Sequence, residues 1–425
     1  MTETHAAPSE GAPAYLSRLQ IFFLAVASAI VVANAYYIHT IISMIADAFG
    51  ISDGMIGIVP AFNQIALALG IFLVLPLGDL ISNRRLTIVS VALQAACVAL
   101  MAIAPSFSVF LAASTILGFF TIAPYLLPAY ASKRVAPSQL GYVTAVLTTG
   151  IIIGILVARA GAGIVAEQVG WRWVYYGAAT LMIAVTLVLP KIMAVEPSQN
   201  AENVTPSSDS PLRQYLGLLT SIVPIALRNP EVLISGAIQG LGFGTFLVVW
   251  MGIGLHVPGP EMGYGVDTVG YLALLAIVSM VTTPWFGRWA DRIGPRRARI
   301  ILASLQSSAI LMLFFVGHSI WLMILPIVMT NMFGPSVDVT GRMTFLSQAP
   351  HLRTRFMTIY IVLMFLGGGL GSWVGTASYA AGGWTGMASS AAVMTSLMLA
   401  FSIYGFVRYR ERDAEALAAA KDQSE

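Results

Sequence analysis

The sequence predicts an all-α membrane protein in which twelve transmembrane helices form two six-helix lobes. The first observation behind this prediction is composition: the 425 residues are 57% hydrophobic and 10% charged, and the mean hydropathy is +0.82. An average soluble protein is about one-quarter charged, so these charges are too few to cover a soluble surface. The second observation is a series of long apolar segments. The third is a charged loop that occurs once in each half.

Each apolar segment is long enough to cross a bilayer, which takes about 20 helical residues. Helices rather than strands are expected, because backbone groups in lipid must be hydrogen-bonded within their own segment. The twelve predicted segments occupy residues 19–44, 54–78, 86–104, 107–131, 138–166, 171–191, 231–256, 267–288, 298–316, 319–345, 356–381 and 385–407.

A polar stretch divides the segments into two groups of six. Within it, Glu196–Ser210 is expected to be flexible, whereas Pro211–Leu227 is either a helix along the inner membrane surface or a plain linker. The expected organisation is a cytoplasmic N-terminal tail, an N-terminal lobe, a cytoplasmic linker, a C-terminal lobe and a cytoplasmic C-terminal tail, at residues 1–17, 18–191, 192–229, 230–407 and 408–425.

The basic residues predict the orientation. Of the 22 Lys and Arg residues, 19 fall on the side of the N-terminus, Arg172 alone falls on the other, and Arg159 and Arg342 lie within or at the edge of segments. Cytoplasmic loops collect Lys and Arg, so both termini are expected in the cytoplasm and the protein in the inner membrane. The net charge of +3 arises in these loops and does not indicate nucleic-acid binding. The single cysteine, Cys97, rules out an intramolecular disulfide.

A short basic loop lies between the second and third segments, and another between the eighth and ninth. The aspartates of these loops, Asp79 and Asp291, lie 212 residues apart. A carboxylate there can pair with Arg or cap a helix, so these loops are predicted to bias one conformation. Ordinary anchoring by positive loops is the alternative. The predicted gating residues are Asp79, Arg84, Arg85, Gly287, Asp291, Arg292, Gly294, Arg296 and Arg297.

The second loop closely resembles the signature Gly-x-Leu-x-Asp-Arg-x-Gly-Arg-Arg of the major facilitator superfamily, with Trp289 in place of Leu. The first loop is a degenerate copy, because Leu80 and Ser82 replace Arg and Gly. The six-plus-six pattern extends this resemblance over the whole chain. It implies the major facilitator fold and alternating access by two rocking lobes around a central site.

Glycines in the fifth and eleventh segments add a second repeat. Gly150 and Gly154 correspond to Gly367 and Gly371 at an offset of 217 residues, and Gly375 continues the spacing of four. Such small residues let helices approach closely, so helix packing is expected. The fifth segment is also similar to the glycine-rich motif of the drug/proton antiporter branch, which implies efflux. Gly170-Trp171 and Gly383-Trp384 form a further matched pair, offset by 213.

Polar and aromatic side chains inside the segments are candidates for substrate binding, because polar groups avoid lipid. Arg159 is the most specific candidate. Its charge within the membrane is expected to attract an anionic or polar substrate, or to form a charge pair that locks the outer gate. The alternative is that its side chain extends to the outer membrane interface. His39 is expected either to titrate near neutral pH or to make a purely structural hydrogen bond. The candidates are Asn34, Tyr37, His39, Asn63, Gln64, Tyr125, Arg159, Gln239 and Trp250. Tyr36, Thr40 and Ser43 share one helix face and are expected to line the cavity, and Phe243, Phe246 and Trp373 are expected to join Tyr125 and Trp250 in an aromatic wall.

Asp338 is a carboxylate well inside the tenth segment, and Arg342 lies one helical turn after it. The spacing predicts that the two side chains pair. Asp338 and Arg342 are therefore candidates for a protonatable coupling site, and a structural ion pair is the alternative.

No catalytic motif, nucleotide-binding loop or cluster of metal ligands occurs in the sequence, so neither an enzyme nor a cofactor or metal is expected. The prediction is a monomeric secondary transporter for proton-linked efflux of a small amphipathic or organic compound. Uptake or exchange of an organic anion is the first alternative, and a transporter-like membrane sensor or enzyme is the second. The expected partners are the small-molecule substrate, protons and the lipid bilayer.

Overall fold

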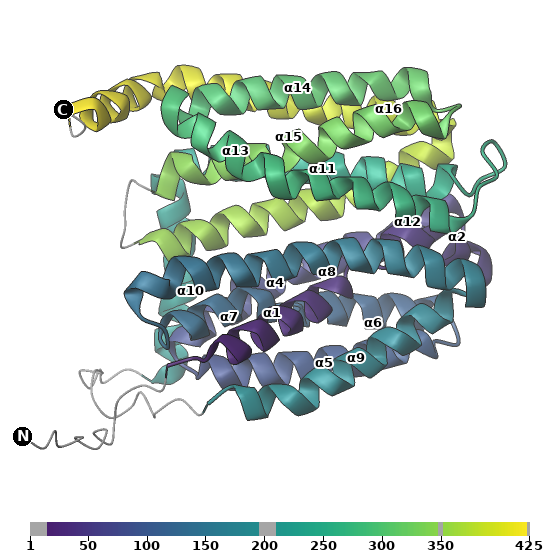
Figure 1. The fold of residues 1–425 in the computed structure, drawn as a ribbon, viewed down its shortest axis with the longest axis horizontal. Coiled ribbons are helices and arrows are strands. Elements are labelled where there is room, and N and C mark those ends of the chain that lie inside the picture. The colour runs from purple at the N-terminus through teal and green to yellow at the C-terminus, as the bar shows by residue number, and fades with distance from the viewer. Residues whose placement is uncertain (1–14, 195–209, 347–351, 423–425) are drawn as a thin grey trace, which may run out of the picture.

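Long helices run side by side along the whole length of the computed structural model (Figure 1). The structure describes residues 15–194, 210–346 and 352–422. The predicted flexible segment Glu196–Ser210 lies almost entirely outside the described residues. Over the first half of the chain the elements are α1 (Arg18–Ala33), α2 (Ile38–Phe49), α3 (Asp53–Ile56), α4 (Ile58–Val74), η1 (Leu75–Asp79), α5 (Asn83–Ala102), α6 (Phe107–Phe120), α7 (Ala123–Ser132), η2 (Pro137–Gln139), α8 (Leu140–Val169) and α9 (Trp171–Ile192).

Several of these elements are consecutive pieces of one membrane crossing: α1 with α2, α3 with α4 and η1, and α6 with α7. The second half begins with a helix in the linker and then repeats the pattern. Its elements are α10 (Pro211–Arg228), α11 (Pro230–His256), α12 (Val266–Leu274), η3 (Leu275–Ile277), α13 (Val278–Ile293), α14 (Pro295–Val316), α15 (Ile320–Leu346) and α16 (Arg353–Asp422).

Within the described residues, eleven helical runs are long and apolar enough to cross a membrane. The last of them, Arg353–Glu411, has 59 residues and is interrupted by non-helical backbone at Gly382 and Gly383. At about 1.5 Å per residue each part is long enough to span a bilayer, and the chain reverses direction at the break (Figure 1). The prediction of twelve crossings in two groups of six is therefore confirmed.

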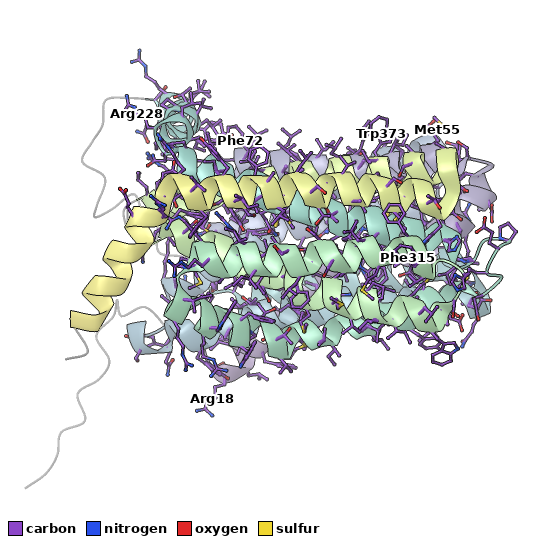
Figure 2. All side chains as sticks on the ribbon, turned by 90° about the horizontal axis from the view of Figure 1, so that it is seen from above. Arg18, Met55, Phe72, Arg228, Phe315 and Trp373 are labelled. Carbon is purple, nitrogen blue, oxygen red and sulfur yellow. The ribbon has the colours of Figure 1, made fainter. Side chains whose placement is uncertain are left out.

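The first residues of α1 and the last residues of α16 lie at the same end of the bundle (Figure 1). This end carries nearly all the basic residues, and we call it the basic end; the opposite end, with Gly170 and Gly383, is the far end. The surface between the two ends is apolar, and side chains such as Phe315 (77% exposed) and Trp373 (49% exposed) point outward from it (Figure 2). Such exposed apolar side chains are typical of helices that face lipid.

The sequence predicted one continuous helix for the first crossing. The structure has two, because a turn at Asn34–Tyr37 separates α1 from α2. The Asn34 Nδ2 group donates to the carbonyls of Ile30 (3.0 Å) and Val31 (3.2 Å). Gln94 of α5 donates to the same Val31 carbonyl at 3.1 Å. Backbone groups freed by a break inside a membrane must be satisfied in this way.

The glycines of the fifth crossing pack α8 tightly against α1. A Cβ atom added at Gly150 would lie 2.5 Å from the Ala25 carbonyl oxygen, and one at Gly154 would overlap the backbone of Ala29. In the other lobe, Gly367 and Gly371 meet the backbone of α11 at Gly240 and Gly244 in the same way, and Gly375 meets Val248. The helix packing that the glycine repeat predicted is therefore confirmed: α8 packs on α1 in one lobe, and α16 packs on α11 in the other.

The Gly-Trp pairs form equivalent turns at the far end. Gly170 (φ 96°) and Gly383 (φ 57°) adopt backbone conformations that side chains disfavour, which lets the chain reverse between two crossings. The following tryptophans are both buried: Trp171 packs against Phe49 and Phe110, and Trp384 donates to the Leu313 carbonyl.

We predict that Gly371→Ala destabilises the protein, whereas Gly161→Ala does not. A methyl group at Gly371 overlaps the Gly244 backbone and costs about 1–3 kcal/mol. A Cβ at Gly161 meets nothing within 4 Å, and alanine is the better helix former. Thermal unfolding of the detergent-solubilised protein measures both. Equal unfolding temperatures for the two variants would contradict the packing assigned to the glycine repeat.

Candidate functional site

Arg159 lies within the membrane-crossing part of α8, about ten residues, or about 15 Å, before the far end of that helix. Its side chain is 1% exposed. The alternative that this arginine snorkels to the outer interface is therefore wrong. A guanidinium at this depth costs several kcal/mol unless other groups stabilise it, so its surroundings decide what it does.

Three aromatic rings surround the Arg159 guanidinium. Its central carbon lies 5.2 Å from the ring centroid of Tyr36, 4.9 Å from that of Phe246 and 4.7 Å from that of Trp250. Tyr36 belongs to the turn between α1 and α2, whereas Phe246 and Trp250 belong to α11. Each ring attracts a cation by up to about 2 kcal/mol in a desolvated site. We call these three rings the aromatic cage; both lobes contribute to it.

His39 of α2 makes the one hydrogen bond recorded for the Arg159 guanidinium among the described residues, at 3.0 Å between His39 Nδ1 and Arg159 Nη2. Arginine has no acceptor, so Nδ1 accepts and the neutral imidazole carries its proton on Nε2. Within the part of the chain that the structure describes, neither His39 Nε2 nor Arg159 Nε has a hydrogen-bond partner. Two buried N–H donors therefore remain available beside the cation.

The charge of Arg159 is not balanced by a carboxylate of the described residues. Across residues 15–194, 210–346 and 352–422, the recorded ion pairs within 4.0 Å do not include Arg159. At an effective dielectric constant near 20, an anion about 4 Å from the guanidinium gains about 4 kcal/mol, against about 1 kcal/mol in bulk water. By this argument, an anion placed beside such a guanidinium is held more strongly than a neutral molecule of the same shape.

Three predicted candidates point into the N-terminal lobe instead of toward Arg159. Tyr37 packs edge-on against Tyr175 of α9, with 6.2 Å between centroids. Asn63 donates to the Ser114 carbonyl of α6 at 2.8 Å, and Asn34 bonds the carbonyls of its own helix. These three side chains therefore make contacts within the N-terminal lobe.

Three other candidates remain consistent with the expectation that they line a central cavity: Gln64, Gln239 and Tyr125. Gln64 of α4 is fully buried, and its amide atoms have no partner among the described residues. Gln239 of α11 is 7% exposed. Tyr125 of α7 packs against Phe365 of α16 across the lobe boundary, with 6.2 Å between centroids.

An aromatic row leads from Tyr125 to the aromatic cage. Phe365 lies 5.8 Å from Phe243, Phe243 lies 6.1 Å from Phe246, and Phe246 lies 6.1 Å from Trp250, measured between ring centroids. Helical spacing explains the α11 members, because residues three or four apart share one face. The row gives an apolar aromatic surface that begins nearer the basic end and finishes at the cation.

The second charged centre is the ion pair between Asp338 and Arg342 of α15. The pair is bidentate, at 3.0 Å and 2.8 Å, as the spacing predicts. Tyr360 of α16 donates to the same carboxylate at 2.7 Å. A Cβ at Gly341 would lie 2.8 Å from the Tyr360 hydroxyl, so glycine makes room for this contact. Sequence reasoning missed Tyr360, whose only signal was a hydroxyl within an apolar segment.

This ion pair is turned toward the other lobe. Tyr125 of the N-terminal lobe interacts electrostatically with Arg342 and Asp338, and also with Tyr36 of the aromatic cage. The side chains of Asp338 and Arg342 are 20% and 32% exposed, so they are not sealed from solvent as Arg159 is.

Two further features do not belong to this site. A groove of about 270 Å³ between α5 and α9 is lined by alanines and by Ile183, Thr186 and Leu187, without an ionisable side chain. In the part of the chain that the structure describes, no three His, Cys, Asp or Glu side chains lie close enough together to hold a metal ion.

The sequence profile of the Major Facilitator Superfamily matches residues 24–334 and 232–424, which together cover most of the chain. The chain belongs to the Major Facilitator Superfamily. It is 25% identical over 394 residues to "Uncharacterized transporter YgaY" of Escherichia coli O157:H7, covering 92% of this chain and 97% of that one. It is also 25% identical over 398 residues to "Probable transporter SCO4007" of Streptomyces coelicolor, covering 92% and 89%.

Solved structures of transporters share the fold. A bacterial homologue of the human lysosomal transporter Spinster, in an inward-facing and occupied conformation, superposes with a TM-score of 0.72 at 14% identity, covering 91% of this chain and 96% of that one. A mutant of the nucleoside transporter NupG gives a TM-score of 0.71 at 13% identity, covering 91% and 99%. At these identities the likeness concerns the fold. The superfamily is therefore established, whereas the drug/proton antiporter branch is not.

The superfamily loops hold their own lobes together in this conformation. Arg84 donates to the carbonyls of Pro190 (3.0 Å) and Met193 (2.6 Å) at the end of α9. Its counterpart Arg296 pairs with buried Glu231 of α11 and lies over the Tyr409 ring. Both arginines therefore fix the third helix of a lobe to its neighbours. The sequence did not predict a role for Glu231, because its partner Arg296 lies 65 residues away in the chain.

The gating role of the remaining loop residues stays a prediction. Asp291 lies at the surface, as do Arg85, Arg292 and Arg297, and no hydrogen bond or ion pair of Asp291 is recorded among the described residues. The backbone of Asp79 is part of η1, but its side chain lies outside the described part of the structure. Gly287 lies within α13, and Gly294 (φ 93°) ends that helix.

The two lobes meet closely toward the far end. Glu167 of α8 accepts the Val266 backbone N–H at the start of α12, at 2.9 Å. A Cβ at Gly163 would lie 2.6 Å from the Val266 carbonyl oxygen, and one at Gly270 would lie 3.0 Å from that of Ala160. Thr376 of α16 also donates to the Gly54 carbonyl at 3.4 Å. These contacts close the far end in this conformation.

We predict that Glu167→Gln weakens the far-end closure. Its carboxylate sits at the N-terminus of α12, where a negative charge contributes about 0.3–1 kcal/mol beyond the hydrogen bond. Spin labels at Val169→Cys and Tyr264→Cys, in a Cys97→Ser background, report the distance between the lobes at this end. The variant should populate longer distances, whereas Glu261→Gln, which removes a carboxylate within one lobe, should not. An unchanged distance distribution in Glu167→Gln would remove this contact from the closure.

Proposed function

We propose that the chain is a secondary transporter that carries an amphipathic organic anion across the inner membrane by alternating access. The observation that carries this proposal is buried Arg159, which lies within the aromatic cage and has no carboxylate partner among the described residues. Of the sequence-based alternatives, it favours an organic anion over a neutral amphipathic compound as substrate. Membership of a superfamily of transporters supports transport in place of sensing or catalysis.

The donors and rings around Arg159 suggest the shape of the substrate. Arg159 Nε and His39 Nε2 supply two N–H groups for an anionic head. The aromatic row from Tyr125 to Trp250 offers a surface for a flat apolar body. A molecule with a carboxylate or sulfonate on an aromatic body matches both requirements, and it would displace part of the aromatic cage from the guanidinium.

The places where the lobes touch support alternating access. Arg159 lies between the lobes, and the contact between Glu167 and Val266 closes the far end beyond it. When that closure opens, contacts at the basic end must form instead, and the loops of Asp79 and Asp291 are the proposed elements there. With both termini in the cytoplasm, the conformation described here has its outer side closed. One chain contains both lobes, so a monomer suffices.

Asp338 is the proposed site of proton coupling. Its carboxylate is partly exposed, is paired with Arg342 and Tyr360, and faces Tyr125 of the other lobe. A proton on Asp338 would remove the negative partner of Arg342 and so change the field between the two lobes. Coupled movement of protons and anion is therefore the mechanism we propose. The export direction stays a prediction that rests on the resemblance to the antiporter branch.

We predict that Arg159→Gln weakens binding of an organic anion far more than binding of its neutral analogue. The probes are naphthalene-2-sulfonate and naphthalene-2-sulfonamide, titrated calorimetrically into the purified protein. Loss of a charge-assisted contact should weaken sulfonate binding by about tenfold to a hundredfold. Arg172→Gln is the matched control, because Arg172 also lies over an aromatic ring but donates to the carbonyls of Ala102 and Ala104. Equal losses for sulfonate and sulfonamide would leave Arg159 a structural role.

We predict that Asp338→Asn abolishes accumulation of the same sulfonate driven by a pH gradient while exchange of labelled for unlabelled sulfonate continues. Asparagine cannot carry the coupled proton, yet both lobes can still move with the bound anion. Flux into proteoliposomes measures both reactions, with Asp267→Asn at the far end as the control. Gradient-driven accumulation at the normal rate in Asp338→Asn would exclude this carboxylate from coupling.

A further inference from the structure

The linker helix α10 runs across the bundle instead of along it. Figure 1 shows it perpendicular to the membrane-crossing helices at the basic end, and in Figure 2 it is seen end-on at the edge of the bundle. The helix therefore lies parallel to the plane of the membrane. The described backbone is helical over the whole of Pro211–Arg228, so this part of the chain is not a plain non-helical linker.

One face of α10 packs on the protein and touches both lobes. Tyr215 donates its hydroxyl to the Leu73 carbonyl near the end of α4, at 2.8 Å. Ile222 and Ala226 are 5% and 9% exposed and join an apolar cluster that includes Ile71 of the N-terminal lobe and Phe356 of the C-terminal lobe. These contacts fix the rotation of α10 about its axis.

The two remaining flanks differ in chemistry. Four large apolar residues at helical spacing form one flank, which we call the apolar flank: Leu212 (66% exposed), Leu216 (48%), Val223 (54%) and Leu227 (70%). The opposite flank carries Gln214, Ser221 and Arg228, spaced by seven. Arg213, exposed like Arg228, lies between the flanks.

We propose that α10 is a membrane-binding surface for anionic phospholipid. The apolar flank inserts among the acyl chains of the cytoplasmic leaflet, and Arg213 and Arg228 bind negatively charged headgroups. Three observations select a bilayer as the occupant. The helix lies parallel to the membrane plane at the end that sequence analysis assigns to the cytoplasm, it borders the outward-facing Phe72 of the bundle (Figure 2), and its arginines complement anionic lipid.

Through this surface, lipid of the cytoplasmic leaflet would be connected to both lobes at once. Because α10 contacts the end of α4 and the cluster around Phe356, lipid bound to it bridges the two inner ends that move apart or together during transport. The proposal concerns a different surface from the Arg159 site and does not depend on the identity of the substrate.

The insertion is tested with an environment-sensitive bimane label in full-length protein, in a Cys97→Ser background. Proteoliposomes contain phosphatidylcholine with about one-third phosphatidylglycerol. Bimane at Leu216→Cys should be quenched by phosphatidylcholine carrying a shallow doxyl group and shielded from aqueous iodide. Bimane at Ser221→Cys, the matched position on the polar flank, should show the reverse. Equal iodide quenching at both sites, or shielding of Leu216→Cys from both quenchers by protein, would overturn the insertion.

Headgroup selectivity is tested by placing the doxyl group on phosphatidylglycerol instead of phosphatidylcholine at equal concentration. Each arginine should enrich the anionic lipid by about fivefold, which corresponds to about 1 kcal/mol. The anionic quencher should therefore act more strongly at Leu216→Cys, and the quenching ratio should approach one in the Arg213→Gln, Arg228→Gln double variant. Arg18→Gln, an exposed arginine on another side of the basic end (Figure 2), should keep the ratio. A ratio that the double variant leaves unchanged would contradict the arginine role.

Discussion

The guanidinium of Arg159, held by aromatic rings from both lobes, is the constraint on which the rest of the site depends. A buried cation costs several kcal/mol, and rings plus one imidazole nitrogen compensate this cost only in part. The aromatic cage is therefore a contact between the lobes, centred on the Arg159 guanidinium. In the proposed mechanism, an anion that replaces some of the rings satisfies the same charge and loosens that contact, which would link binding to lobe movement.

The second charged centre has the opposite character. Asp338, Arg342 and Tyr360 satisfy one another within the C-terminal lobe, so the charges of the pair cancel. Such a pair is poorly suited to binding an anion and well suited to a change of protonation that upsets its balance.

The sequence predicted features that depend on local pattern. Apolar length gave the twelve crossings, and the spacing of Gly150 and Gly154 gave a helix contact repeated in both lobes. Features that depend on three-dimensional neighbours could not be predicted in this way. The Val31 carbonyl before the break at Asn34–Tyr37 accepts from Gln94 of another helix, and Tyr37 packs against Tyr175 of α9. The pairing of His39 with Arg159 joins residues 120 positions apart, and no one-dimensional pattern marks it.

The most direct test of this account is a structure of the full-length protein with naphthalene-2-sulfonate bound, determined by electron cryomicroscopy in lipid nanodiscs. The account predicts sulfonate density within hydrogen-bond distance of Arg159 and His39, with the naphthalene rings against Trp250 or Phe246. Density for the sulfonate at Arg342 instead, with the aromatic cage still closed around Arg159, would contradict it.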